Sequence, residues 1–318
     1  MDYASYGEAP RHMYFWTGVS AIAGALRRKV WIDQAYFKWY PNFYIVLVAP
    51  PGIVSKSTTA GVGMGLLRKV PGVKFGPDVV TWPALVGAFA ESTEAFEYEG
   101  NLHPMSALTL ESSEFGNLLN PQDKDMVDLL VALWDGKPGT FEKKTKHSGN
   151  DSVENPWINL IACTTPSWIA GNFPEYMIGA YPGLRVPPNL DKMAERLVED
   201  LSHIGALAGE YKLTPEAVAW GEAWYQRHYT VRSATLDDDR FGGYIARKQT
   251  HIHKLAMVLA ASSGDKMQIT PDHLIIADQM VTDLEPDMSF VFSKIGKSET
   301  ALYAERLVWV VHSKGAVP

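Results

Sequence analysis

The chain has 318 residues, of which 46% are hydrophobic and 20% charged, and its formal net charge is -7. This length allows two domains or one large domain with an appendage, and the apolar fraction is ordinary for a globular protein. The acidic balance argues against a uniformly basic nucleic-acid-binding protein, and the single cysteine, Cys163, excludes a disulfide framework and a thiolate metal site. No basic segment followed by an apolar stretch opens the chain, and no run of about 18 apolar residues occurs, so we expect a cytoplasmic protein with no signal peptide and no membrane span.

Short apolar runs alternate with helical patterns in the first half of the chain. The runs lie at residues 30–32, 43–49, 73–75, 107–110 and 158–163. Runs that are apolar on both faces favour a parallel sheet covered by helices. Their alternation with helical segments predicts an α/β fold.

Helical patterns dominate after about residue 189. Thr214 and Thr270 are each followed by Pro and an acid, which is typical of a helix N-terminus. We predict a further helix over residues 244–262 and a polar loop over residues 232–243. The expected organisation is a lead-in of helix and strand (1–42), an α/β core (43–185) and a helical region (186–318).

The segment 43–59, FYIVLVAPPGIVSKSTT, has the order that a phosphate-binding P-loop requires. A buried strand runs into a turn with Gly52, and a helix pattern follows from Lys56. Backbone N–H groups of such a turn and of the helix N-terminus bind phosphate oxygens. We expect Lys56 to reach the β- and γ-phosphates of ATP and the Ser57 hydroxyl to ligate Mg²⁺. The segment departs from G-x-x-x-x-G-K-[ST] at Pro50 and Ser55, and a plain strand–turn–helix is the alternative.

Acidic and hydroxyl side chains end the next two apolar runs. Glu111 and Glu114 follow the run at 107–110, and a P-loop ATPase needs an acid there to hold magnesium or to orient the attacking water. Glu114 is the first candidate and Glu111 the second, and two solvated glutamates are the alternative. Thr164 and Thr165 end the run at 158–163, where RecA-like motors carry a polar γ-phosphate sensor, and we assign Thr165 a catalytic role.

Two basic segments are candidates for contacts with phosphate. We expect a polar loop that contacts DNA or a neighbouring subunit at residues 141–147, which include Lys143, Lys144 and Lys146. In the segment RKQTHIHK (247–254), Arg247 and Lys254 share a helix face with His251, so Arg247 could reach a phosphate. Solvated charged surface is the alternative in both places.

These segments together resemble the DUF3987 group of phage- and plasmid-type primase-helicase ATPases. The resemblance covers APRHMYFWTGVSAIAGALRRKVWI (9–32), VAPPGIVSKSTT (48–59), LTLESSEFG (108–116), LLVALWDGKPGTFEKKTKHSG (129–149), NPWINLIACTTPSWI (155–169) and RFGGYIARKQTHIHKLAMVLAAS (240–262), in the same order. It implies a RecA-like core, related to replicative DNA helicases, that works as a ring in the cytoplasm of a bacterium or a phage-infected cell. It assigns the catalytic acid to Glu114, a γ-phosphate sensor to Thr164 or Thr165, and the nucleotide contacts to Gly52, Ser55, Lys56, Ser57 and Thr58.

The chain departs from this family in two places. Residues 177–189 are shorter than the family pattern, which leaves Arg185 as the one nearby candidate for a finger arginine. A winged-helix-like domain is expected after residues 314–318. The resulting hypotheses are an ATP-driven DNA helicase or translocase of the replication type, a nucleotide-binding assembly or scaffold protein without motor activity, and a small-molecule phosphotransferase on the same fold.

Overall fold

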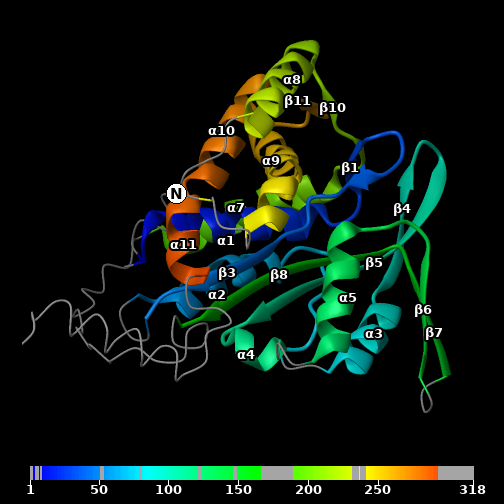
Figure 1. Cartoon of the computed structure of the whole chain (residues 1–318). Coiled ribbons are helices and arrows are strands. Elements are labelled where there is room, and N and C mark those ends of the chain that lie inside the picture. Colours follow the sequence, from blue (N-terminus) through cyan, green and yellow to red (C-terminus); the bar gives the residue numbers. More distant parts are fainter. Residues whose placement is uncertain are drawn as a thin grey trace, which may run out of the picture.

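A four-stranded sheet lies at the centre of the protein in the computed structural model (Figure 1). The structure describes residues 3, 7, 9–50, 54–78, 81–119, 123–145, 149–165, 189–230, 236 and 241–292, with the backbone alone for 141–145, 149–152 and 289–292. The strand order is β3-β8-β5-β4, with β3 parallel to β8 and β8 parallel to β5. The predicted α/β class with parallel strands is therefore confirmed. The strands span Tyr44–Val48 (β3), Pro156–Thr164 (β8), Asn101–Ser112 (β5) and Thr93–Tyr98 (β4).

The central strand β8 accounts for the apolar run at residues 158–163. All nine of its residues are buried, because helices cover both faces of the sheet. Successive side chains of the strand point to opposite faces. Ile161 and Cys163 join one hydrophobic core, whereas Ile158 and Leu160 join the other.

Helices form a layer on each side of the sheet. The α1/α2 face packs closely because α2 is rich in small residues: a Cβ on Gly63 would lie 2.4 Å from Cγ2 of Thr17 in α1. On the other face, α5 begins at a capped end, where the Asp123 carboxylate accepts a hydrogen bond from the Met126 N–H at 3.1 Å. The first layer contains α1 (Arg11–Leu26) and α2 (Lys56–Leu67), with α7 (Leu190–Ala206) packed on them, and the second contains α3 (Trp82–Glu91), α4 (Phe115–Leu118) and α5 (Lys124–Asp135).

The helical region packs against the beginning of the chain. Strand β1 (Val30–Asp33) pairs in parallel with β9 (Gly209–Glu210) and in antiparallel fashion with β2 (Lys38–Trp39). Helix α1 therefore lies between the sheet and α7 and α9 (Figure 1). The helices predicted after Thr214 and Thr270 are confirmed, and each begins at a proline. The region contains α8 (Pro215–Thr230), α9 (Gly242–Ser263), α10 (Pro271–Thr282), α11 (Glu285–Phe292), β10 (Lys212–Leu213) and β11 (Gln268–Ile269).

Two segments differ from the prediction, and a third is largely outside the described residues. Residues 73–75 supply one isolated bridge, from Phe75 to Thr109, rather than a strand. The polar loop predicted around Lys143 is wrong, because β6 (Thr140–Thr145) and β7 (Gly149–Glu154) form a hairpin. Paired backbone groups hold this ladder together, and a polar sequence gives no apolar alternation that would reveal it. Most of the loop predicted at 232–243 lies outside the described residues.

Candidate functional site

The three parallel strands bring the predicted site residues to one edge of the sheet. In the register of the sheet, Val48 at the end of β3 lies opposite Thr164 at the end of β8, and Ser112 at the end of β5 lies opposite Ala162. The Ala49 N–H extends the ladder by donating to the Thr164 carbonyl at 3.3 Å. The carboxyl ends of parallel strands are where α/β sheets bind ligands, because the following helices point their N-termini at this edge.

Helix α2 presents an open N-terminus at this edge. It starts at Lys56, which is half-buried, while Ser57 and Thr58 in its first turn are exposed. Its N-cap residue, Ser55, makes no side-chain capping bond, and the Lys56 N–H donates to the Val54 carbonyl at 2.8 Å. The next N–H groups of the first turn keep their capacity to bind an anion. The Thr59 hydroxyl instead donates to the Ser55 carbonyl at 2.8 Å, which fixes the first turn.

The two candidate acids have different surroundings. Glu111 points toward α2, where its Oε2 accepts a hydrogen bond from Nη2 of Arg68 at 3.0 Å. Its Oε1 lies 3.8 Å from where a Cβ on Gly61 would be, which places the carboxylate against α2. Glu114 is half-buried at the start of α4, and no ion pair or hydrogen bond reaches its carboxylate from the described residues. Glu114 is therefore the acid that remains available to a ligand.

Charged groups from three elements act on the Cys163 thiol, near the end of β8. Burial raises the pKa of this fully buried thiol to about 11. The Lys56 ammonium lowers that pKa, and the carboxylates of Glu111 and Glu114 raise it further. Lys56, Glu111 and Glu114 are thus the charged groups that act on this thiol at the sheet edge.

Thr164, the next residue of β8, carries an unpaired polar atom at the same edge of the sheet. Its side chain is fully buried, and its Oγ1 has no hydrogen-bond partner in the part of the chain that the structure describes. Buried hydroxyls are nearly always paired, so an unpaired one at a strand end is typical of a site that a ligand completes. Thr165, which the sequence favoured, lies one residue beyond the strand and is half-buried.

The donor set at this edge fits magnesium. Ser57 offers a hydroxyl and Glu114 a carboxylate, and both are hard oxygen ligands. Within the described ranges, no group of three or more His, Cys, Asp or Glu side chains could hold a metal ion. Mg²⁺ is usually bound through one or two protein oxygens together with substrate phosphates, and Ser57 and Glu114 could provide such oxygens.

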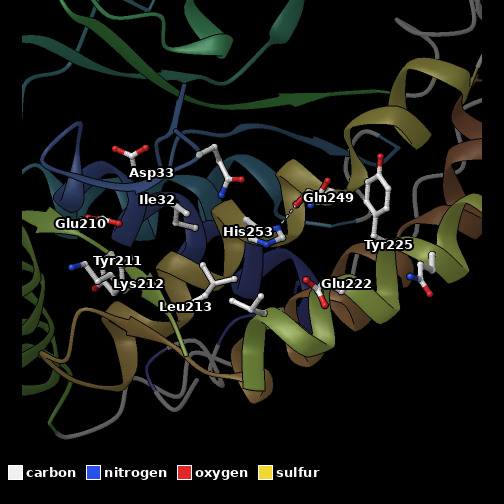
Figure 2. A pocket seen from close by; sticks show the side chains of 14 residues that line it. Ile32, Asp33, Glu210, Tyr211, Lys212, Leu213, Glu222, Tyr225, Gln249 and His253 are labelled. Atoms are coloured by element: carbon white, nitrogen blue, oxygen red, sulfur yellow. Dashed lines mark hydrogen bonds between the residues drawn. The ribbon is translucent and has the colours of Figure 1, made fainter. Parts of the chain in front are cut away.

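A groove away from this edge has the wrong charge for a nucleotide. This groove, with a volume of about 870 Å³, is formed by β1, β9, β10, α8 and α9. Figure 2 shows Asp33 and Glu210 on one side and Glu222 on α8 on the other. Lys212 is its one lysine, and three carboxylates against one ammonium disfavour a phosphate ligand.

Of the remaining candidates from the sequence, Arg247 lies away from the sheet edge with Lys56. Arg247 lies 5.5 Å from the ring centroid of Trp134, whose carbonyl accepts a hydrogen bond from Asn42 just before β3, so it sits at the amino-terminal edge of the sheet. Lys143 and Lys144 lie on β6, of which the backbone alone is described. Gly52, Lys146 and Arg185 lie outside the described residues.

Comparison with protein-family models and with curated proteins finds no match for this chain. In the part of the chain that the structure describes, no helix is long and apolar enough to cross a membrane.

Sequence reasoning missed Arg68 as the partner of Glu111. The two residues are 43 positions apart, and the contact depends on how α2 lies on β5. The available signal was the position of Arg68 on the same predicted helix as Lys56, which does not specify a partner strand.

Proposed function

We propose that the protein binds ATP with magnesium at the carboxyl edge of β3, β8 and β5, and hydrolyses it as a P-loop ATPase with a RecA-like core. The observation that carries the proposal is the convergence of Lys56, Glu114 and Thr164 at the ends of three neighbouring elements. A plain strand–turn–helix does not require an unpaired acid and an unpaired buried hydroxyl at the ends of the two neighbouring strands.

Each side chain has a role that its position supports. The first-turn N–H groups of α2 bind phosphate oxygens, and Lys56 places its ammonium on the β- and γ-phosphates. Ser57 and Glu114 would hold the magnesium ion, which when bound neutralises phosphate charge. Glu114 also orients the attacking water, and the Thr164 hydroxyl donates to the γ-phosphate region. The ion pair with Arg68 holds the Glu111 carboxylate against α2. There it contributes to the electrostatic potential of the site rather than contacting the attacking water.

The wider role that we propose is a DNA helicase or translocase of the phage or plasmid replication type, in a homo-oligomeric ring. Support comes from the resemblance of the segments that carry the site, and single-stranded DNA would then stimulate turnover. Lys143, Lys144 and Lys146 are the proposed backbone contacts and Arg185 the finger arginine. The Glu111–Arg68 pair favours one competing function, a nucleotide-binding assembly protein without a motor, because it neutralises one of the two acids.

Equilibrium binding of a fluorescent ATP analogue, with magnesium, tests the nucleotide site. Lys56→Ala removes a charge-assisted contact worth about 1.5–3 kcal/mol, so affinity should fall about 10- to 150-fold. Lys69→Ala is the matched control, because Lys69 is exposed just after the other end of α2. Equal affinity for the two variants would remove the basis of the proposal, and binding without turnover would favour the assembly protein.

A further inference from the structure

The turn between β1 and β2 holds two aromatic side chains in solvent. Tyr36 is 98% exposed and Phe37 is 52% exposed. The turn is well fixed, since the Gln34 N–H donates to the Phe37 carbonyl at 2.9 Å and the Ala35 N–H donates to Oδ1 of Asp33 at 2.7 Å. Ala35 has a φ of 63°, a left-handed conformation that is uncommon for alanine. A rigid turn that displays aromatic rings is typical of a binding surface.

These rings stand at the rim of a groove with aromatic walls. The groove has a volume of about 440 Å³ and is lined by residues of the β1–β2 turn and the β4–β5 hairpin. Strands β1 and β4 lie near the right of Figure 1. Trp31 meets Tyr98 edge-on with 5.2 Å between ring centroids, and Phe96 stacks on His103 at 5.4 Å. This volume is at the lower end of the range for small-molecule sites, which is about 300–1,000 Å³.

One side of the groove contains a cation without a full set of partners. Arg28 is 4% exposed, and its Nη1 donates to the Pro156 carbonyl at 3.0 Å. Its Nη2 has no hydrogen-bond partner among the described residues. The guanidinium lies over the Tyr40 ring, 4.0 Å from the centroid. A small side-chain shift, of the kind common on binding, would present this donor to an acceptor group in the groove.

The charges of the wall nearly cancel. Arg28 and Lys38 are offset by Asp33 and Glu99. The Lys38 ammonium lies 4.4 Å from the Trp31 ring centroid and 4.0 Å from Asp33 Oδ2, so it is already partly neutralised. Phosphate attraction is therefore weak here, and stacking has to supply most of the affinity.

We propose that this groove binds a nucleobase, supplied by a single-stranded nucleic acid that crosses the β1–β2 turn. Planar rings with hydrogen-bond acceptors match both features, since Tyr36 and Phe37 offer π-faces and Arg28 offers a buried donor. The choice of a single strand as the source rests on the proposed function. This site is separate from the phosphate contacts proposed for Lys143 and Lys144 on the β6–β7 hairpin. The groove would bind the nucleic acid through base stacking rather than through phosphates.

Fluorescence anisotropy of a labelled oligothymidylate, titrated with the full-length protein, tests this site. Stacking is worth about 1–3 kcal/mol per base, so Tyr36→Ala/Phe37→Ala should weaken binding about 5-fold or more. Tyr225→Ala/Tyr229→Ala is the matched control, because these α8 rings are 46% and 52% exposed. Circular dichroism would verify that both double variants stay folded. Because base stacking releases few counterions, Tyr36→Ala/Phe37→Ala should lose affinity with little change in the slope of log affinity against log salt concentration.

The outcomes separate this proposal from its competitors. Competition by thymidine monophosphate at similar concentrations would support a single-base site for free nucleotides, and its absence would support a single strand. Equal binding by the two double variants, or a salt slope that becomes clearly shallower in Tyr36→Ala/Phe37→Ala, would overturn the proposal. A change in self-association instead of oligonucleotide binding would make the surface a protein interface and would also overturn it. Lys56→Ala should bind the oligonucleotide normally, so failure of the ATP site is distinguishable.

Discussion

Replacing Thr164 by valine should make the protein more stable and less active. The side chain is fully buried and its Oγ1 has no partner in the described part of the chain. An unpaired buried hydroxyl costs about 1–3 kcal/mol, and valine has nearly the same shape without that group. Thr164→Val should therefore raise the free energy of unfolding by about 1–3 kcal/mol. With an unfolding entropy of about 2.1 cal/mol/K per residue, that corresponds to a Tm increase of about 2–4 °C.

ATP turnover should change in the opposite direction. If the hydroxyl donates to the γ-phosphate region in the transition state, its loss should lower kcat about 10²- to 10³-fold, as for other preorganised donors. A stabilised protein with impaired catalysis is the signature of a polar group kept for function rather than for folding.

Thermal melts followed by circular dichroism, beside turnover assays, measure both effects. Thr59→Val is the matched control, since Thr59 is equally buried but its hydroxyl donates to the Ser55 carbonyl at 2.8 Å. The free energy of unfolding of Thr59→Val should be lower than that of the wild type by about 1 kcal/mol. A lower Tm for Thr164→Val would refute the reasoning, because it would mean that the hydroxyl has a partner in the folded protein.

Three further predictions follow from other contacts. Glu114→Gln should lower kcat about 10²-fold or more in turnover assays, whereas Glu111→Gln, at a carboxylate already paired with arginine, should have a smaller effect; the reverse order would exchange their roles. Burial lowers the pKa of Lys254 from 10.5 to about 7, so the unfolded chain binds an extra proton between these values and stability should rise with pH there by about 1.4 kcal/mol per unit. Denaturant melts of Lys254→Met should lack that slope, and an unchanged slope would contradict the assignment. Gly63→Ala should destabilise by about 1–3 kcal/mol because its Cβ would clash with α1, whereas Gly65→Ala, with open space around it, should stabilise slightly; equal melts would refute the packing.

Local sequence patterns were sufficient to predict the strands whose ends form the candidate site. The apolar runs at 43–49 and 158–163 predicted β3 and β8, since a strand buried on both faces has a nearly continuous apolar sequence. The spacing of Arg247, His251 and Lys254 predicted one helix face, and all three lie beside Trp134, with centroid distances of 5.5, 5.3 and 3.7 Å. Helical spacing identifies a shared face but does not name the residue that the face contacts.

Long-range pairing could not be predicted in the same way. The pairing of β1 with β9 joins residues about 180 positions apart, and no local pattern encodes such a partner. The distinction between Thr164 and Thr165 depended on the residue at which β8 ends, and strand boundaries are the least certain part of any sequence interpretation. The aromatic groove was missed because its walls come from β1, β2, β4 and β5, which the fold brings together.

ATP turnover by the purified protein, with and without single-stranded DNA and beside Lys56→Ala, tests the central claim most directly. The account predicts magnesium-dependent hydrolysis that DNA stimulates and that Lys56→Ala abolishes, because its ammonium acts on the β- and γ-phosphates. Turnover that is unchanged in Lys56→Ala, or ATP that neither binds nor turns over in the wild type, would contradict it.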